Sequence, residues 1–85
     1  MRLMERTVTF YTTPGCSLCE TARTLLESYS AYVDFQIREE DILNFVAADD
    51  PLAERIPILE YGGHRLYWPF DGATLHSWYQ RIGST

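Results

Sequence analysis

The feature that most constrains the fold is the segment of residues 8–29, VTFYTTPGCSLCETARTLLESY, which contains the only two cysteines of the chain. A short run with alternating apolar residues ends at a Thr-Pro-Gly turn, after which Cys16 and Cys19 open a segment with helical periodicity. Such a turn places Cys16 at or just before the helix N-terminus, where free backbone N–H groups stabilise a thiolate. Cys19 follows about one helical turn later, close enough to close a small disulfide ring. We therefore expect Cys16 to be the reactive sulfur.

The length and the charge of the chain exclude several classes of protein. Its 85 residues predict one domain, residues 1–85, with a small core. The formal net charge of −5, with arginine as the only basic side chain apart from histidine, predicts neither a nucleic-acid nor a membrane partner. The N-terminus lacks an apolar core and no later run could span a bilayer, so we expect a cytoplasmic protein. In that reducing compartment, a lone Cys-x-x-Cys pair is more typical of catalysis or metal binding than of a structural disulfide.

Periodicity predicts two strands and a helix in the first half of the chain. The expected bounds are residues 7–11 for the first strand, Ser17–Ser30 for the helix and residues 33–38 for the second strand. The apolar side of this helix is expected to carry Leu18, Ala22, Leu25, Leu26 and Tyr29. Because a helical crossover joins the two strands, we expect them to be parallel. The acidic run of residues 39–41 is expected to be a solvated face.

Turn and cap residues organise the second half of the chain. Apolar residues between positions 42 and 46 fit either a helical turn or a loop over the core. Asp50 and Asp71 are expected N-caps, and the pair Gly62 and Gly63 fits a tight hairpin turn. The expected bounds are residues 51–55 for a short helix, 56–61 and 65–68 for the hairpin strands, and 72–82 for the last helix, whose buried side is Leu75, Trp78, Tyr79 and Ile82. The prediction is an α/β fold, a four-stranded mixed sheet with helices on both faces, in the order β-α-β-α-β-β-α.

Three motifs resemble those of the thioredoxin fold in its short, glutaredoxin-like form. They are Cys16-Ser17-Leu18-Cys19, Ile56-Pro57, and Trp68-Pro69-Phe70-Asp71 before the last helix. The chain is most similar to the small, mainly bacterial glutaredoxin-like proteins, a family of poorly defined role. The resemblance implies a thiol-disulfide oxidoreductase, in which the Cys16 thiolate attacks a substrate disulfide and Cys19 resolves the mixed disulfide. It also implies that Pro57 is cis and faces the cysteine pair, with the Ile56 backbone available to an extended substrate.

The resemblance also implies a set of substrate-binding residues around the cysteines. They are Thr13, Pro14, Gly15, Ser17, Leu18, Arg55, Ile56, Pro57, Trp68 and Asp71. We expect the substrate to be a disulfide in a protein or a small molecule, and the electron donor to be glutathione or a thioredoxin-reductase-like enzyme. No tightly bound cofactor and no metal are expected. Glutathione-using members typically carry a lysine where this chain has Thr13, and a diglycine before the last helix. Arg23, Arg55 and the start of the last helix are therefore the remaining candidates for binding the glutathione carboxylates.

Other interpretations of the same residues stay open. The cysteines could be small buried hydrophobes, or the chain could be a redox-silent module that holds a peptide. Zinc needs four ligands, and apart from the two cysteines only His64 and His76 remain. A metal or cluster would therefore have to be bridged through Cys16 by a dimer, whereas we expect a monomer.

Two observations limit the roles of residues near the cysteines. Glu20, beside the pair, would raise the pKa of Cys16 and oppose its activation. Simple core packing explains Tyr11, Thr12, Trp68 and Phe70 as well as a place in the substrate groove does.

Overall fold

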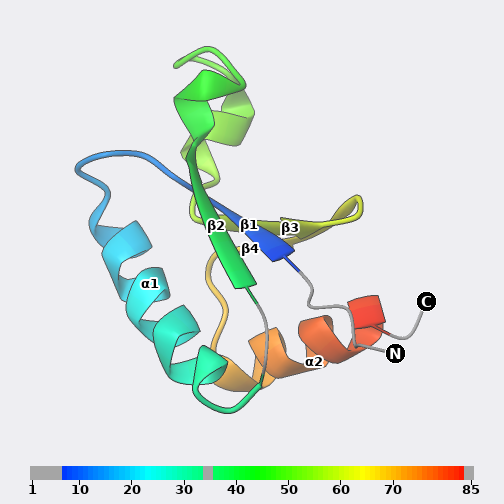
Figure 1. Ribbon diagram of the computed structural model, residues 1–85. Coiled ribbons are helices and arrows are strands. Elements are labelled where there is room, and N and C mark those ends of the chain that lie inside the picture. The colour runs from blue at the N-terminus through cyan, green and yellow to red at the C-terminus, as the bar shows by residue number, and fades with distance from the viewer. Residues whose placement is uncertain (1–6, 34–35, 84–85) are drawn as a thin grey trace.

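The structure, a computed structural model, describes residues 7–33 and 36–83. Its elements follow the predicted order, with the predicted short helix present as a 3-10 helix that Asp50 caps. A second 3-10 helix precedes it and decides between the two alternatives for residues 42–46 in favour of a helical turn. The bounds are Thr7–Thr12 (β1), Ser17–Ser30 (α1), Gln36–Asp41 (β2), Ile42–Asn44 (η1), Pro51–Glu54 (η2), Ile58–Tyr61 (β3), His64–Tyr67 (β4) and Gly72–Gly83 (α2). The predicted α/β architecture, a mixed four-stranded sheet flanked by helices, is confirmed (Figure 1).

The strands are ordered β2-β1-β3-β4 in the sheet. β1 and β2 are parallel, as the crossover predicts, whereas β3 is antiparallel to both β1 and β4. Gly62 and Gly63 connect β3 to β4 with φ angles of 56° and 87°, a conformation that favours glycine and is typical of two-residue hairpin turns. The predicted hairpin is therefore confirmed, although β3 begins two residues later than expected.

The second strand is shifted along the chain relative to its prediction. The prediction places it at residues 33–38, whereas the strand begins at position 36 and continues to Asp41. Residues 34 and 35 of the predicted strand lie outside the described residues. The observed bounds follow from parallel pairing with β1, in which Ile37 lies opposite Val8. The acidic run that the sequence analysis assigns to a solvated face is thus the carboxyl end of a strand.

Both α-helices pack against the same face of the sheet. Their shared core consists of Val8, Phe10, Ala22, Leu26, Leu59, Phe70, Leu75, Trp78, Tyr79 and Ile82. The predicted buried side of α2 is confirmed, because all four of its apolar residues lie in this core. The prediction of helices on both faces is wrong. The link between β2 and β3 forms only η1 and η2, which lie beyond the carboxyl end of β2 rather than over the second face (Figure 1).

The second face of the sheet carries polar and aromatic side chains. Strand pairing places Glu60 between Thr9 and Arg65, and Arg65 Nε lies 3.6 Å from Glu60 Oε1. Near the end of β1, the Tyr11 ring makes an edge contact with Phe45, which follows η1, with ring centroids 5.4 Å apart. Side chains of the link therefore cover part of this face in place of a helix.

Strand pairing gathers several segments at one end of the sheet. The parallel register places Thr12, at the end of β1, opposite Asp41 at the end of β2. The antiparallel register places the start of β3, just after Pro57, beside the end of β1. The Trp68 N–H donates to the Pro57 carbonyl at 3.2 Å, which adds the end of β4 to the group. The loop after β1 leads directly to Cys16, so the cysteine pair lies at this end as well.

Candidate active site

Cys16 occupies the N-cap position of α1, as the sequence predicts. Its backbone is extended, with φ −90° and ψ 107°, and its sulfur accepts a hydrogen bond from the Cys19 N–H at 3.1 Å. That N–H belongs to the first helical turn, whose donors have no intrahelical partner. The two cysteines form a disulfide with a Cα–Cα distance of 5.2 Å. Cys16 is partly exposed, whereas Cys19 is 1% exposed, so only the first sulfur is open to an external reactant.

Thr13, Pro14 and Gly15 form the connection from β1 to α1, which we call the cysteine loop. Gly15 has φ 83°, and no atom lies within 4 Å of the position that a Cβ would occupy. Backbone conformation rather than lack of space therefore requires glycine at this position. The resulting turn delivers Cys16 to the N-terminus of the helix.

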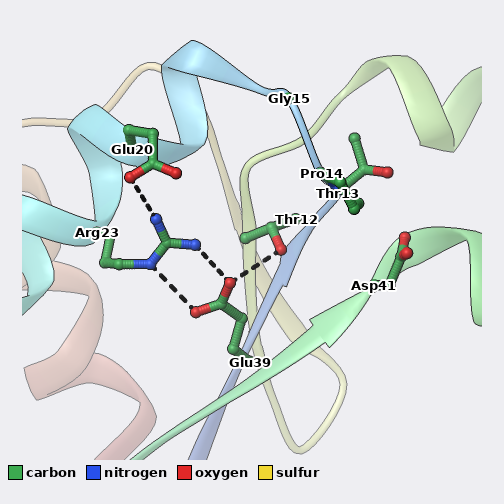
Figure 2. Close-up of a pocket in the computed structure, with 8 residues that line it drawn as sticks. All are labelled: Thr12, Thr13, Pro14, Gly15, Glu20, Arg23, Glu39 and Asp41. Carbon is green, nitrogen blue, oxygen red and sulfur yellow. Dashed lines mark hydrogen bonds and ion pairs between the residues drawn. The ribbon is translucent and has the colours of Figure 1, made fainter.

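A cavity of about 420 Å³ lies beside the cysteine loop. It is lined by Thr12, Thr13, Pro14, Gly15, Glu20, Arg23, Glu39 and Asp41. Figure 2 shows these residues coming from β1, the loop, α1 and β2, with the Asp41 and Thr13 side chains on the side opposite to α1. Of the ten predicted substrate-binding residues, the three of the cysteine loop thus line this cavity.

Within this cavity, carboxylate oxygens face all three guanidinium nitrogens of Arg23. Its Nε donates to Glu39 Oε1 at 3.2 Å, its Nη2 pairs with Glu39 Oε2, and its Nη1 lies 2.6 Å from Glu20 Oε1. The Thr12 side chain, which is buried, donates its hydroxyl to Glu39 Oε2 at 3.2 Å. This network joins the end of β1, the first half of α1 and the end of β2 around the cysteine loop (Figure 2).

The network also shifts the pKa values of its charged groups. Hydrogen bonds to Glu39 and then to Glu20 raise the pKa of Arg23 above its ordinary value. The hydrogen bond from Arg23 is the main cause that lowers the pKa of Glu39. Both side chains are therefore charged at neutral pH. Arg23, a predicted candidate for binding the glutathione carboxylates, is already paired with two carboxylates of the protein.

A second group of predicted site residues surrounds Pro57. The Ile56–Pro57 and Trp68–Pro69 peptide bonds are both cis. Pro57 is buried and Ile56 is partly exposed, next to the end of β1. Trp68 packs edge-on against Phe70, with ring centroids 5.0 Å apart, and both contact the core. These residues thus form a partly buried wall at the same end of the sheet as the cysteine loop.

The remaining predicted site residues lie at the surface. Ser17 and Leu18 are exposed in the first turn of α1, so the assignment of Leu18 to the apolar side of the helix is wrong. In this first turn the inward position belongs to the neighbouring Cys19, which lies on the same side of α1 as the buried Ala22 and Leu26. The Arg55 guanidinium carbon lies 4.1 Å above the ring centroid of Tyr67. Asp71 caps α2, as predicted, because its carboxylate accepts a backbone N–H of the first turn at 2.8 Å.

Glu39 and Asp41 line the site, although neither is among the site residues predicted from the sequence. In the sequence they belong to a run of charged residues, which is most often a solvated surface. The signal that could have located them is the parallel pairing of the first two strands. The carboxyl ends of parallel strands lie at the edge of the sheet where α/β proteins bind ligands, and a second strand extended beyond residue 38 reaches that edge.

The histidines lie away from this cavity. His64 is exposed on the hairpin, and His76 Nδ1 lies 2.8 Å from the Tyr29 hydroxyl, between α2 and α1. Among the described residues, no group of three or more side chains is placed to hold a metal ion. None of the helices in the described part of the chain is long and apolar enough to cross a membrane.

The four-stranded mixed sheet and the Cys-x-x-Cys pair at the start of its first helix define a thioredoxin-like fold of the glutaredoxin-like class. The model of the Glutaredoxin-like domain (DUF836) matches residues 7–80, and the chain belongs to this family. The X-ray structure of Northeast Structural Genomics target protein XcR50 from X. campestris is similar at 28% sequence identity and a TM-score of 0.71. The similarity covers 87% of this chain and 96% of that chain. No curated protein matches the chain. Family membership and the cysteine pair together indicate a function of the thiol redox type.

Proposed function

We propose that this protein is a thiol-disulfide oxidoreductase with Cys16 as the nucleophile and Cys19 as the resolving cysteine. The observation that carries the proposal is the Cys16 sulfur at the N-cap of α1, where it accepts the Cys19 N–H. The thiolate is the reactive form of cysteine, and this donor, together with the positive end of the helix dipole, favours the thiolate. Burial of Cys19 restricts it to reaction within the protein.

The proposed reaction reduces the substrate by two electrons. The Cys16 thiolate attacks one sulfur of a disulfide R–S–S–R, so that a mixed disulfide forms, the R–S–S–R bond breaks, and the first R–S⁻ leaves and takes up a proton. Cys19 then loses its proton and attacks the Cys16 sulfur. The mixed disulfide breaks, the second R–S⁻ leaves, and the Cys16–Cys19 disulfide forms. We propose glutathione or a thioredoxin-reductase-like enzyme, as the family resemblance implies, as the source of the two electrons that restore the dithiol.

The proposed substrate groove runs along Ile56 and Pro57. In support, β3 directly follows these two residues and pairs with the end of β1, from which the cysteine loop leads to Cys16. An extended substrate would pair with the Ile56 backbone and contact Trp68, in the manner of a strand added to a sheet. Arg55, exposed above the Tyr67 ring, would flank the same groove.

Single-cysteine variants test the assigned roles without interference, because the chain has no third cysteine. Reduced protein is mixed with hydroxyethyl disulfide and followed by mass spectrometry. The wild type is expected to form its internal disulfide and release two thiols, whereas Cys19→Ser accumulates a stable adduct on Cys16. Cys16→Ser should form neither product at a comparable rate. An equally active Cys16→Ser variant, or a Cys19→Ser variant without adduct, would contradict the proposal and favour a redox-silent binding module.

A further inference from the structure

The cavity beside the cysteine loop carries more negative than positive charge. Among the described residues that line it, Glu20, Glu39 and Asp41 supply three carboxylates and Arg23 one guanidinium, so the formal charge is −2. The cysteine loop forms one wall of this cavity, and its last residue, Gly15, directly precedes Cys16 in the chain (Figure 2). Glu20 of the same cavity is close to Cys16 as well, because its N–H donates to the Cys16 carbonyl at 3.3 Å. The negative charge of the cavity therefore acts on a group attached to a disulfide that reacts at Cys16.

The charge of Arg23 is not available to an anionic ligand. Glu39 binds its Nε and Nη2 as a bidentate pair, and Glu20 faces its Nη1. A substrate carboxylate could reach the guanidinium only by displacing one of these side chains, and it would then lie beside the other. Like charges at such short distance repel one another, so the arrangement opposes an anionic group instead of binding it.

Two carboxylates of the cavity are held in place by hydrogen bonds. Glu39 accepts the hydroxyl of the buried Thr12 as well as the Arg23 donors. Asp41 accepts the Leu43 N–H at 3.0 Å, the cap of η1. Because these bonds already orient both groups, their charges act on an approaching substrate without rearrangement of the protein.

We propose that Glu39 is a specificity-determining residue, which makes the site select disulfides flanked by a cationic group over anionic ones such as glutathione disulfide. This inference rests on the proposed function and names its substrate class. Glu39 acts in two ways, because it occupies the Nε and Nη2 donors of Arg23 and its charge lowers the formal charge of the cavity from −1 to −2. A protein or peptide disulfide with a lysine or arginine nearby has the matching charge.

Three small disulfides of different charge measure this selectivity: cystamine, which is cationic, hydroxyethyl disulfide, which is neutral, and dithiodipropionate, which is anionic. The second-order rate constant for oxidation of the reduced protein is divided by the rate constant of the same disulfide with dithiothreitol, a neutral thiol. At low ionic strength this ratio should fall in the order given, by about fivefold at each step. In about 1 M salt, where the Debye length is about 3 Å, the differences should largely disappear.

Charge-neutral variants locate the source of the selectivity. Glu39→Gln leaves Arg23 paired with Glu20 alone and changes the formal charge of the cavity from −2 to −1, so it should reduce the preference for cystamine over dithiodipropionate from about 25-fold to about fivefold. Asp41→Asn should have a similar effect and serves as a second variant, because asparagine also caps helices well. Glu27→Gln is the control. It removes an exposed carboxylate of α1 that does not line the cavity, and the variant should keep the preference of the wild type.

The possible results separate the inference from the proposed function. A reduced protein that reacts with none of the three disulfides contradicts the proposed function. A protein that reacts with all three at equal relative rates retains that function and overturns the inference alone. An equal loss of preference in Glu27→Gln and Glu39→Gln would assign the effect to the overall charge of the chain and would likewise overturn the role of Glu39.

Discussion

The network around Arg23 should contribute to stability in a way that depends on pH, and Glu39→Gln measures this contribution. The substitution keeps the length and shape of the side chain while it removes its negative charge. At neutral pH the variant lacks the ion pair with Arg23 and accepts a weaker hydrogen bond from Thr12. It therefore separates the effect of the charge from that of side-chain packing.

The expected loss can be worked out from the exposure of the partners. The Glu39 side chain is 44% exposed and that of Arg23 is 30% exposed, so water screens the pair, and we expect about 0.5 kcal/mol from it. The hydroxyl of Thr12 is buried, and its hydrogen bond to the carboxylate adds about 0.5 kcal/mol. A total of about 1 kcal/mol corresponds to a decrease in Tm of about 4–8 °C for a domain of this size.

The pH dependence of this loss follows from the pKa of Glu39. The hydrogen bond from Arg23 lowers that pKa in the folded state, so at acidic pH the unfolded state binds more protons than the folded state. The stabilisation is therefore complete above the unfolded pKa of about 4.3 and is lost as the pH falls through the folded pKa. The difference in Tm between the wild type and Glu39→Gln should be largest at neutral pH and shrink with acidification.

Thermal unfolding followed by circular dichroism, from neutral pH downward, measures the difference directly. Glu27→Gln serves as the matched control, because Glu27 is exposed on α1 and is expected to leave Tm almost unchanged at neutral pH. The reasoning is refuted if Glu39→Gln is as stable as the wild type at neutral pH. A decrease in Tm of the same size at every pH would also refute it, since the loss could not then come from the charge.

Substitutions at three further positions test other parts of the structure. Leu26→Ala removes most of a fully buried side chain of α1 and should lower the free energy of unfolding by about 3 kcal/mol in urea titrations; a loss below about 1 kcal/mol would contradict the close packing of this helix on the sheet. Gly15→Ala places a Cβ at φ 83° and should lower it by about 1–2 kcal/mol, whereas Gly15→Asn should lose less, because asparagine tolerates this conformation; equal losses would contradict the conformational argument. Asp71→Ala should lower Tm at neutral pH, and Asp71→Asn should largely restore it as an N-cap. Because the backbone hydrogen bond of Thr74 lowers the pKa of Asp71, the effect of Asp71→Ala should diminish as the pH falls through that pKa, and an effect independent of pH would argue against the capping role of the carboxylate.

The parts of the fold that could be predicted from the sequence depend on local signals. The Thr-Pro-Gly turn before Cys16 predicts a helix start, and the sulfur is indeed the N-cap of α1. The pair Gly62 and Gly63 predicts a two-residue turn because glycine adopts positive φ without strain, and both residues do so. Apolar residues at helical spacing predict the buried side of α2, where they pack into the core.

The parts that could not be predicted depend on pairing between distant segments. Alternation of apolar residues places the second strand at residues 33–38, but pairing with β1 extends it to Asp41. The carboxylate of Glu39 is stabilised at this strand end by hydrogen bonds from Arg23 and Thr12. These partners are distant in the sequence, so no local pattern predicts them. The same limitation explains why the prediction of helices on both faces is wrong, since the link between β2 and β3 forms only two short 3-10 helices at the end of the sheet.

The order of the strands has a consequence for the association of separate molecules. β2 and β4 are the outer strands of the described sheet, and outer strands offer backbone groups to which strands of neighbouring copies can add. β2 carries four consecutive charged residues, 38–41, and β4 is only four residues long. Charge and short length both oppose edge-to-edge aggregation. The acidic end of β2 thus protects the protein against self-assembly into extended sheets as well as shaping the charge of the cavity.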